Sequence, residues 1–135
     1  MAAVDVVDRY VAELAVAGRD ARRLGHGEWG ITVRSEATGD WPLDVGVRLA
    51  DGVLRVQAEA LEAGDAVNPW NLLHWNRQTR FVRFGCTRAG AIWVHGDLPA
   101  AAVDEQALDR LLGLVAEAAL AARELKAKGE SSSRS

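Results

Sequence analysis

Three histidines and one cysteine are the side chains in this sequence best suited to bind a metal or act as nucleophiles. His26, His74 and His95 are spread along the chain, and no pair has the H-x-x-x-H spacing that places two imidazoles on one helix face. Cys86 is a lone thiol on the predicted inward side of a strand, where cysteine acts as a small core residue. We expect no metal site and no activated thiolate.

A glycine pattern, G-x-G-x-x-G, occurs at residues 25–30. Dinucleotide binding needs a buried strand before the first glycine and a helix after the third, because the helix N-terminus holds the pyrophosphate. An arginine-rich link precedes this pattern, and the alternating, β-branched run ITVRSE follows it. We interpret the glycines as a loop that enters a strand and expect no cofactor.

The remaining polar residues lack the arrangement that catalysis requires. No serine has the sequence context of a nucleophile, and carboxylates such as Asp104 and Glu105 fall at a predicted helix start. General acid–base catalysis needs a carboxylate held in a cleft with a shifted pKa. We predict that the chain has no catalytic residues and is not an enzyme.

One cluster combines basic and aromatic side chains. Such interleaving can stack bases and follow a phosphate backbone, but it is also compatible with a sheet face that pairs its arginines with Asp44 and Glu59. The formal net charge of −3 argues against nucleic acid. The cluster consists of Arg77, Arg80, Arg83 and Arg88 with Trp75, Phe81 and Trp93.

Hydrophobic periodicity predicts the elements that would position these residues. Helices show apolar residues every three or four positions, and strands show strict alternation. We expect a frayed turn or a polar connection at residues 19–25, RDARRLG. The pattern predicts a helix over 3–17, strands over 28–36, 42–50 and 53–61, a short helix over 69–78, strands over 80–87 and 91–97, and a final helix from Asp104 to Gly129.

Length and composition indicate a single domain. The chain has 135 residues, and we assign 1–128 to one domain and 129–135 to a disordered tail. A single cysteine fits a reducing compartment, the acidic N-terminus does not resemble a signal peptide, and no apolar run is long enough to span a bilayer. We expect a cytoplasmic protein without membrane contact.

Two sets of large side chains are candidates for contact surfaces. The short helix carries more apolar bulk, including Trp70 and Trp75, than one stripe can bury. On the strands, aromatic side chains share a face with charged residues, which favours cross-strand pairing or a partner-binding surface. This predicted sheet-face site consists of Phe81, Arg83, Trp93 and His95.

The order helix, three strands, helix, two strands, helix resembles the type III secretion chaperone-like fold. The run from Leu72 to Pro99 resembles YbjN-type proteins of that superfamily. The similarity lies in a helix ending in leucines and Asn76, a strand with Arg80 and Phe81, a turn at Gly90, an apolar strand through Ile92 and Val94, and a stop at Leu98-Pro99.

The resemblance implies an α+β fold, with a twisted antiparallel sheet and two long helices packed on one of its faces. It also implies a homodimer through the short middle helix, for which we assign Trp70, Leu73 and Trp75. Secretion chaperones bind extended segments of partner proteins without chemistry, and YbjN-type proteins are described as sensory transduction regulators. The chaperones are strongly acidic, whereas this chain carries only −3.

We therefore predict a non-enzymatic protein-binding module that acts as a chaperone-like or regulatory adaptor and forms a homodimer. The first alternative is a nucleic-acid-associated protein that uses the cluster from Arg77 to Arg88. The second is a small-molecule binder whose pocket is assembled in space.

Overall fold

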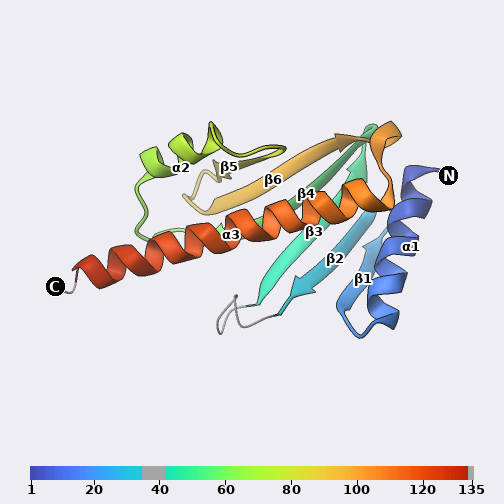
Figure 1. The fold of residues 1–135 in the computed structure, drawn as a ribbon, viewed down its shortest axis with the longest axis horizontal. Coiled ribbons are helices and arrows are strands. Elements are labelled where there is room, and N and C mark those ends of the chain that lie inside the picture. The colour runs from blue at the N-terminus through green and yellow to red at the C-terminus, as the bar shows by residue number, and fades with distance from the viewer. Residues whose placement is uncertain (35–41, 134–135) are drawn as a thin grey trace.

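The structure is a computed structural model that describes residues 1–34 and 42–133, with side chains described up to Lys126. It contains three α-helices and a sheet whose strands are joined in the order β1-β2-β3-β4-β6-β5, with every neighbouring pair antiparallel (Figure 1). The elements are α1 (Ala3–Val16), β1 (Asp20–Gly25), β2 (Glu28–Val33), β3 (Leu43–Ala50), β4 (Val53–Leu61), α2 (Pro69–Asn76), β5 (Val82–Cys86), β6 (Ile92–Pro99), a 3-10 turn (Ala100–Ala102) and α3 (Glu105–Ser133).

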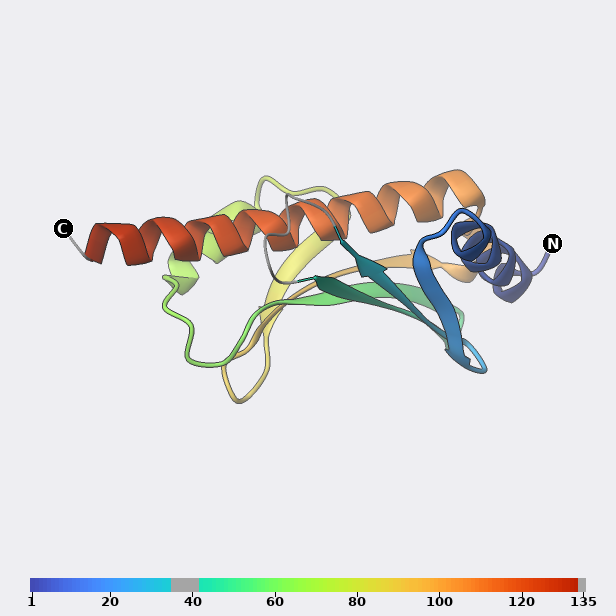
Figure 2. The same ribbon diagram turned by 90° about the horizontal axis from the view of Figure 1, so that it is seen from below.

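The helices α1 and α3 cover one face of the twisted sheet and leave the other face uncovered (Figure 2). Alternating apolar residues of the strands point toward the helices, as period-two patterning requires. Val47 and Val56 lie opposite each other on β3 and β4, and both are buried together with Leu108 and Val115 of α3. This core confirms the predicted α+β fold class.

The turn between β3 and β4 sets the register of the central strands. Asp51 and Gly52 have φ angles of 54° and 75°, as a two-residue hairpin turn with left-handed central residues requires. Leu49 and Leu54 consequently pair across the hairpin. The predicted strand 53–61 is confirmed with both its ends.

The prediction of a frayed turn or polar connection at residues 19–25 is wrong, because β1 forms there. β1 carries only one partly buried side chain, Ala21, and its other side chains are exposed. Its structure comes from backbone pairing with β2 and from the packing of α1 against it. Neither interaction produces an alternating hydrophobic pattern, so the sheet gains a strand that periodicity does not indicate.

Several predicted element ends also shift: α2 ends at Asn76, β5 spans Val82–Cys86, and β6 continues through Pro99. The helix α3 continues past Gly129, where we expected it to end, and reaches Ser133. The predicted strand 28–36 is seen as β2 up to Val33, and residues 35–36 lie outside the described part of the chain. The start of α2 is confirmed, because the side chain of Asn68 accepts a hydrogen bond from the Trp70 N–H at 3.0 Å.

Candidate functional site

The histidines and the cysteine lie on different elements of the fold. His26 lies in the turn between β1 and β2, His74 on α2 and His95 on β6. Within the described residues, no group of three or more metal-ligating side chains comes together. Cys86 is exposed, which corrects our inward assignment. It alternates with the buried Val82 and Phe84 but is the last residue of β5, where its side chain is exposed.

The glycine pattern at residues 25–30 forms part of a β-hairpin. Gly27 has a φ of 70°, and its carbonyl accepts a hydrogen bond from the Leu49 N–H at 2.8 Å. A Cβ at this position would lie only 2.8 Å from the Leu49 carbonyl oxygen, so the backbone approach requires glycine. No helix follows the third glycine, because β2 occupies that position. The glycines therefore close a turn and offer no helix N-terminus to a pyrophosphate.

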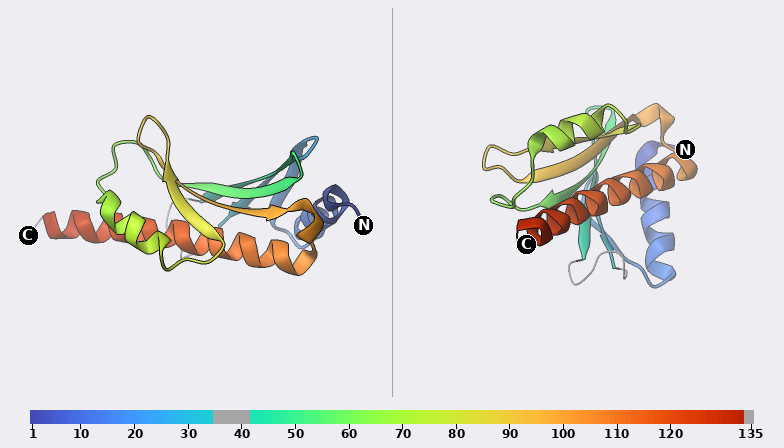
Figure 3. Two further views of the ribbon diagram at one scale, coloured as in Figure 1. Left: turned by 90° about the horizontal axis from the view of Figure 1, so that it is seen from above. Right: turned by 60° about the vertical axis from the view of Figure 1, so that its left-hand side comes forward.

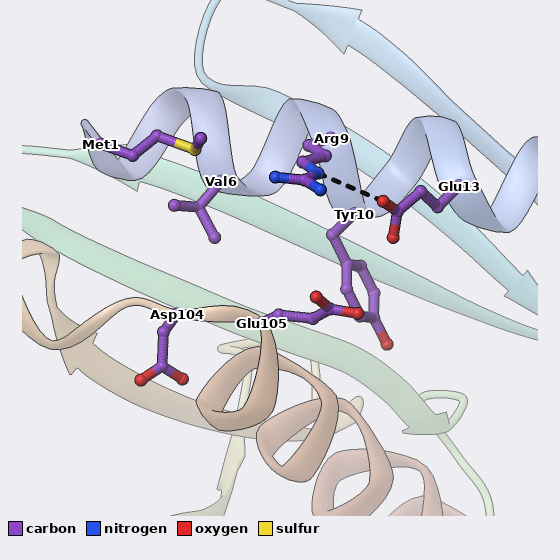
Figure 4. A pocket seen from close by; sticks show the side chains of 7 residues that line it. All are labelled: Met1, Val6, Arg9, Tyr10, Glu13, Asp104 and Glu105. Carbon is purple, nitrogen blue, oxygen red and sulfur yellow. Dashed lines mark hydrogen bonds and ion pairs between the residues drawn. The ribbon is translucent and has the colours of Figure 1, made fainter.

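A shallow hollow of about 150 Å³ lies between α1 and the start of α3 (Figure 4). Some of its polar groups are already bonded within the helices. Arg9 pairs with Glu13 on α1 at 3.2 Å, and Asp104 accepts a hydrogen bond from the Ala107 N–H at the start of α3 at 2.7 Å. Ligand pockets typically have volumes of roughly 300–1,000 Å³, so this hollow is smaller than a typical ligand pocket. It is lined by Met1, Val6, Arg9, Tyr10, Glu13, Asp104 and Glu105.

Two side-chain hydrogen bonds near this hollow join α1 to α3 and to β2. The Tyr10 hydroxyl donates to Asp109 across the α1–α3 contact at 2.7 Å, and the Trp29 indole N–H donates to Asp8 at 2.8 Å. Burial, followed by the hydrogen bond to Asp109, raises the pKa of Tyr10 well above its usual range. Asp8 is partly buried, whereas Asp109 remains exposed. Both carboxylates stabilise the fold.

The helix α2 presents an exposed stripe, which we call the α2 stripe: Trp70, Leu73, His74 and Arg77. The spacing i, i+3, i+4, i+7 places these four side chains on one helix face. Trp70 and Leu73 are 75% and 55% exposed. Trp75 differs from the other predicted dimer residues, because it is half-buried and its ring lies 5.9 Å from that of Phe84. Two of the three predicted dimer residues are thus free for contact.

Asn76 holds α2 against the edge of the sheet. Its side-chain amide accepts a hydrogen bond from the Phe84 N–H at 2.8 Å and donates one to the Phe84 carbonyl at 3.2 Å. One side chain thereby replaces the missing strand at this part of β5. Thr79 donates to the Val82 carbonyl at 2.7 Å on the same strand. Figure 3 shows the resulting position of α2 beside β5. Side chains therefore occupy backbone groups of β5 that an added strand would need.

The predicted sheet-face site is brought together in part. Arg83 and His95 lie opposite each other on β5 and β6, on the uncovered face, and Trp93 lies beside them opposite Gly85. Phe81 is 60% exposed but precedes β5 with a φ of 68°, so strand alternation does not direct its side chain. The Arg83 guanidinium turns back to the Val82 carbonyl at 2.7 Å.

The basic-aromatic cluster does not form one stacking platform. Trp75 packs with Phe84 on the helix-covered side, whereas Trp93 lies on the opposite face of the sheet. Arg77, Arg80 and Arg88 are exposed, and in the part of the chain that the structure describes none of them forms an ion pair. The predicted charge pairs with Asp44 and Glu59 are likewise missing among the described residues. The sequence-level signal that we missed is the lack of acidic residues around these arginines.

Comparison with known proteins identifies the fold. Residues 69–125 match the family model YbjN, described as "Putative bacterial sensory transduction regulator". No curated protein matches the sequence. None of the helices in the described part of the chain has the length and apolar composition that a membrane crossing requires.

Solved structures with the same fold share little sequence with this chain. The Yersinia pestis type III secretion chaperone SycH, solved in complex with a stable fragment of YscM2, has a TM-score of 0.64 at 13% identity, covering 88% of this chain and 98% of that chain. The HopA1–SchA chaperone–effector complex has a TM-score of 0.66 at 12% identity, covering 90% and 91%. YbjN from E. coli, described as "a putative transcription regulator", has a TM-score of 0.60 at 15% identity, covering 89% and 90%.

The family match covers α2, β5, β6 and most of α3, while the structural similarity extends over nearly the whole chain. The predicted resemblance is therefore confirmed: residues 69–125 match the YbjN family model, and the chain has the fold seen in type III secretion chaperones and in YbjN.

Proposed function

We propose that this chain is a non-enzymatic protein-binding module that acts as a chaperone-like or regulatory adaptor. The observation that carries the proposal is the exposure of Trp70 and Leu73 on a helix that is otherwise well anchored to the fold. Large apolar side chains grouped on a surface mark interaction sites, and tryptophan is enriched among residues that dominate binding energy. Two solved structures with this fold, SycH with a fragment of YscM2 and the HopA1-SchA chaperone–effector complex, contain partner proteins, which supports the same type of activity here.

The organisation of polar groups also supports a role in binding. Among the described residues, every buried side-chain nitrogen and oxygen has a hydrogen-bond partner. Catalytic sites typically contain strongly perturbed groups in a cleft. Here the perturbed hydroxyl of Tyr10 is bonded to Asp109 between two helices, where it stabilises packing. The exposed surfaces are the parts of this molecule that remain for function.

A pull-down from a lysate of cells that produce the protein tests this proposal. We expect the wild type to capture a defined partner, identified by mass spectrometry, that the double variant Trp70→Ala/Leu73→Ala does not capture. Trp93→Ala serves as the matched variant on the uncovered sheet face. Capture that is unchanged in all of these variants would contradict the proposal. Loss with Trp93→Ala alone would place the contact at the sheet-face site.

The homodimer through α2 is a second arrangement compatible with the exposed Trp70 and Leu73. Trp75 would contribute less than we predicted from the sequence, since it already packs on Phe84. Light scattering at micromolar concentration tests this arrangement. A dimer that dissociates in Trp70→Ala/Leu73→Ala supports it, and a monomer contradicts it.

A further inference from the structure

The C-terminal half of α3 contacts the part of the chain that leads from β4 into α2. Residues 62–68 form this connection, which we call the α2 linker. The linker passes close to α3 on its way to α2 (Figure 1). Two basic side chains of α3, Arg123 and Lys126, reach this region from one helix face, because positions three apart are neighbours on a helix surface.

Arg123 holds the end of β4 at the point where the chain leaves the sheet. The register of β4 against β6 shifts between Glu59 and Leu61, which makes Ala60 the extra residue of a β-bulge. A bulge bends its strand and interrupts the pairing there. The Arg123 Nε donates a hydrogen bond to the Ala60 carbonyl at 3.3 Å, across 63 residues of sequence. This bond fixes the bent end of the strand to α3.

Lys126 holds the linker itself through Asp65. One carboxylate oxygen of Asp65 lies 2.8 Å from the Lys126 Nζ, and the other accepts a hydrogen bond from the Glu62 N–H at 2.9 Å. The Asp65 N–H donates to the Glu62 carbonyl at 3.1 Å, which closes a tight turn. The Lys126 and Asp65 side chains are only 32% and 21% exposed, so water and salt screen this pair less than a fully exposed one.

The linker places the first turn of α2. The C-terminal end of α2 is bonded to the sheet by Asn76, which makes two hydrogen bonds to Phe84. Within the helix, Leu72 is the buried side chain. The N-terminal end, with Trp70, follows directly from the linker, whose Val67 packs against the core. The direction in which the linker leaves β4 therefore sets the position of Trp70.

We propose that Arg123 and Lys126 form a clamp that holds the bulge of β4 and the linker and thereby positions the N-terminal half of α2. Asp65 is the point in the linker that the clamp grips. The inference rests on the proposed binding function, because the α2 stripe lies on the helix that the clamp positions. An open clamp lets the linker and the first turn of α2 fluctuate while the sheet stays folded. Binding through the α2 stripe then weakens, because more disorder has to be lost on association.

Hydrogen exchange of the full-length chain, followed by mass spectrometry, tests the clamp. Lys126→Met keeps the apolar stem of the side chain and removes its charge. We expect the amides of residues 62–72 to exchange at least about fivefold faster in this variant, while those of β3 keep their wild-type rates. Asp65→Asn should accelerate the same residues. The double variant should add little to the larger single effect, because both substitutions remove one contact.

Two further variants are the controls for the exchange measurement. Lys126→Arg keeps a positive charge that can pair with the carboxylate, and exchange of residues 62–72 should stay within about twofold of the wild type. Arg48→Met breaks an exposed ion pair with Glu28 that measures 3.9 Å on strands β2 and β3. It should leave exchange of the linker unchanged, because it lies outside the clamp.

Binding separates a positioning role from a purely structural one. The contact to measure is the one that Trp70→Ala/Leu73→Ala removes, either self-association by light scattering or capture of a partner by pull-down. Lys126→Met should weaken this contact at least about threefold, and Lys126→Arg should restore it. Far-ultraviolet circular dichroism establishes that these variants are folded, so that a loss of binding reflects the position of α2.

Several results would overturn the inference. Wild-type exchange of residues 62–72 in Lys126→Met would do so and leave the proposed function intact. Faster exchange with undiminished binding would do the same, because the α2 stripe would then not depend on the clamp. Equal acceleration of the linker in Arg48→Met would show that the effect is not local. If Trp70→Ala/Leu73→Ala removes no contact, the proposed function fails, and the exchange rates alone decide whether the clamp exists.

Discussion

The aromatic side chains at the two ends of this molecule differ in burial and in hydrogen bonding. At the α1 end, Trp29 is 1% exposed and donates to Asp8, and Tyr10 is buried and donates to Asp109. At the α2 end, Trp70 is 75% exposed and its ring makes no aromatic contact among the described residues. Acidic groups accept hydrogen bonds from both aromatic side chains at the first end, whereas residues 66–96, which include α2, contain arginines and no acidic residue.

This difference suggests that the α1 end contributes mainly to stability, whereas the α2 end offers a surface for recognition. The α1 end uses its aromatic and acidic residues to join both long helices to the sheet, so its polar bonds contribute to folding. The α2 end is held by Asn76 and by the contact of Trp75 with Phe84, which leaves one face of the helix unused by the chain itself. Substitutions at the two ends should therefore change different properties.

The largest effect is expected for Trp29→Ala. The substitution removes a fully buried indole from the core and costs about 3–5 kcal/mol of unfolding free energy, and it also leaves Asp8 without its donor. Urea denaturation followed by circular dichroism measures the change. A loss below about 1 kcal/mol would mean that the α1 end is not the stabilising half of the comparison.

Asn76→Ala is expected to have the next largest effect, since it removes both hydrogen bonds to Phe84. Unpaired backbone groups at this edge should cost about 1–3 kcal/mol. The Phe84 amide should also exchange its hydrogen faster. Asn71→Ala is the matched control, because Asn71 is exposed on the same helix, and it should change stability by less than about 0.5 kcal/mol. Equal effects of the two variants would remove Asn76 from the anchoring role.

Tyr10 offers a spectroscopic test, because it is the only tyrosine. Burial and the bond to Asp109 raise the pKa of Tyr10, so the phenolate absorbance of the folded protein should develop well above pH 10, the usual tyrosine value. Because the pKa is higher in the folded state, Tyr10 contributes stability that is complete below about pH 10 and is lost as the pH rises further. Asp109→Asn should lower the pKa of Tyr10 without restoring its usual value, because burial, the larger cause, remains. Titration near pH 10 in the wild type would contradict the observed packing.

Trp70→Ala should have the smallest effect on stability. An exposed side chain of this kind contributes less than about 0.5 kcal/mol to folding, in contrast to the buried Trp29. Urea denaturation under the conditions used for Trp29→Ala makes the two values directly comparable. A loss above about 1 kcal/mol would show that Trp70 packs on its own chain, and the α2 stripe would lose its role as a free surface.

Short-range chemistry in the sequence is sufficient to predict most of the elements. Alternation predicts β3 and β4, the Asp51-Gly52 pair predicts their turn, and Asn68 followed by Pro69 predicts the start of α2. These signals work because burial of one face and local backbone preferences act within a few residues. The surplus of apolar residues on α2 likewise predicts an exposed surface, although not which tryptophan provides it.

Tertiary packing decides the rest. β1 forms through pairing with β2 and contact with α1, neither of which leaves a periodic pattern in its own residues. Tyr10 and Asp109 are 99 residues apart, so no local signal relates them. Cys86 has the inward register of its strand yet is exposed at the end of β5. Periodicity indicates which side chains share a face, but only the arrangement of the elements decides what covers that face.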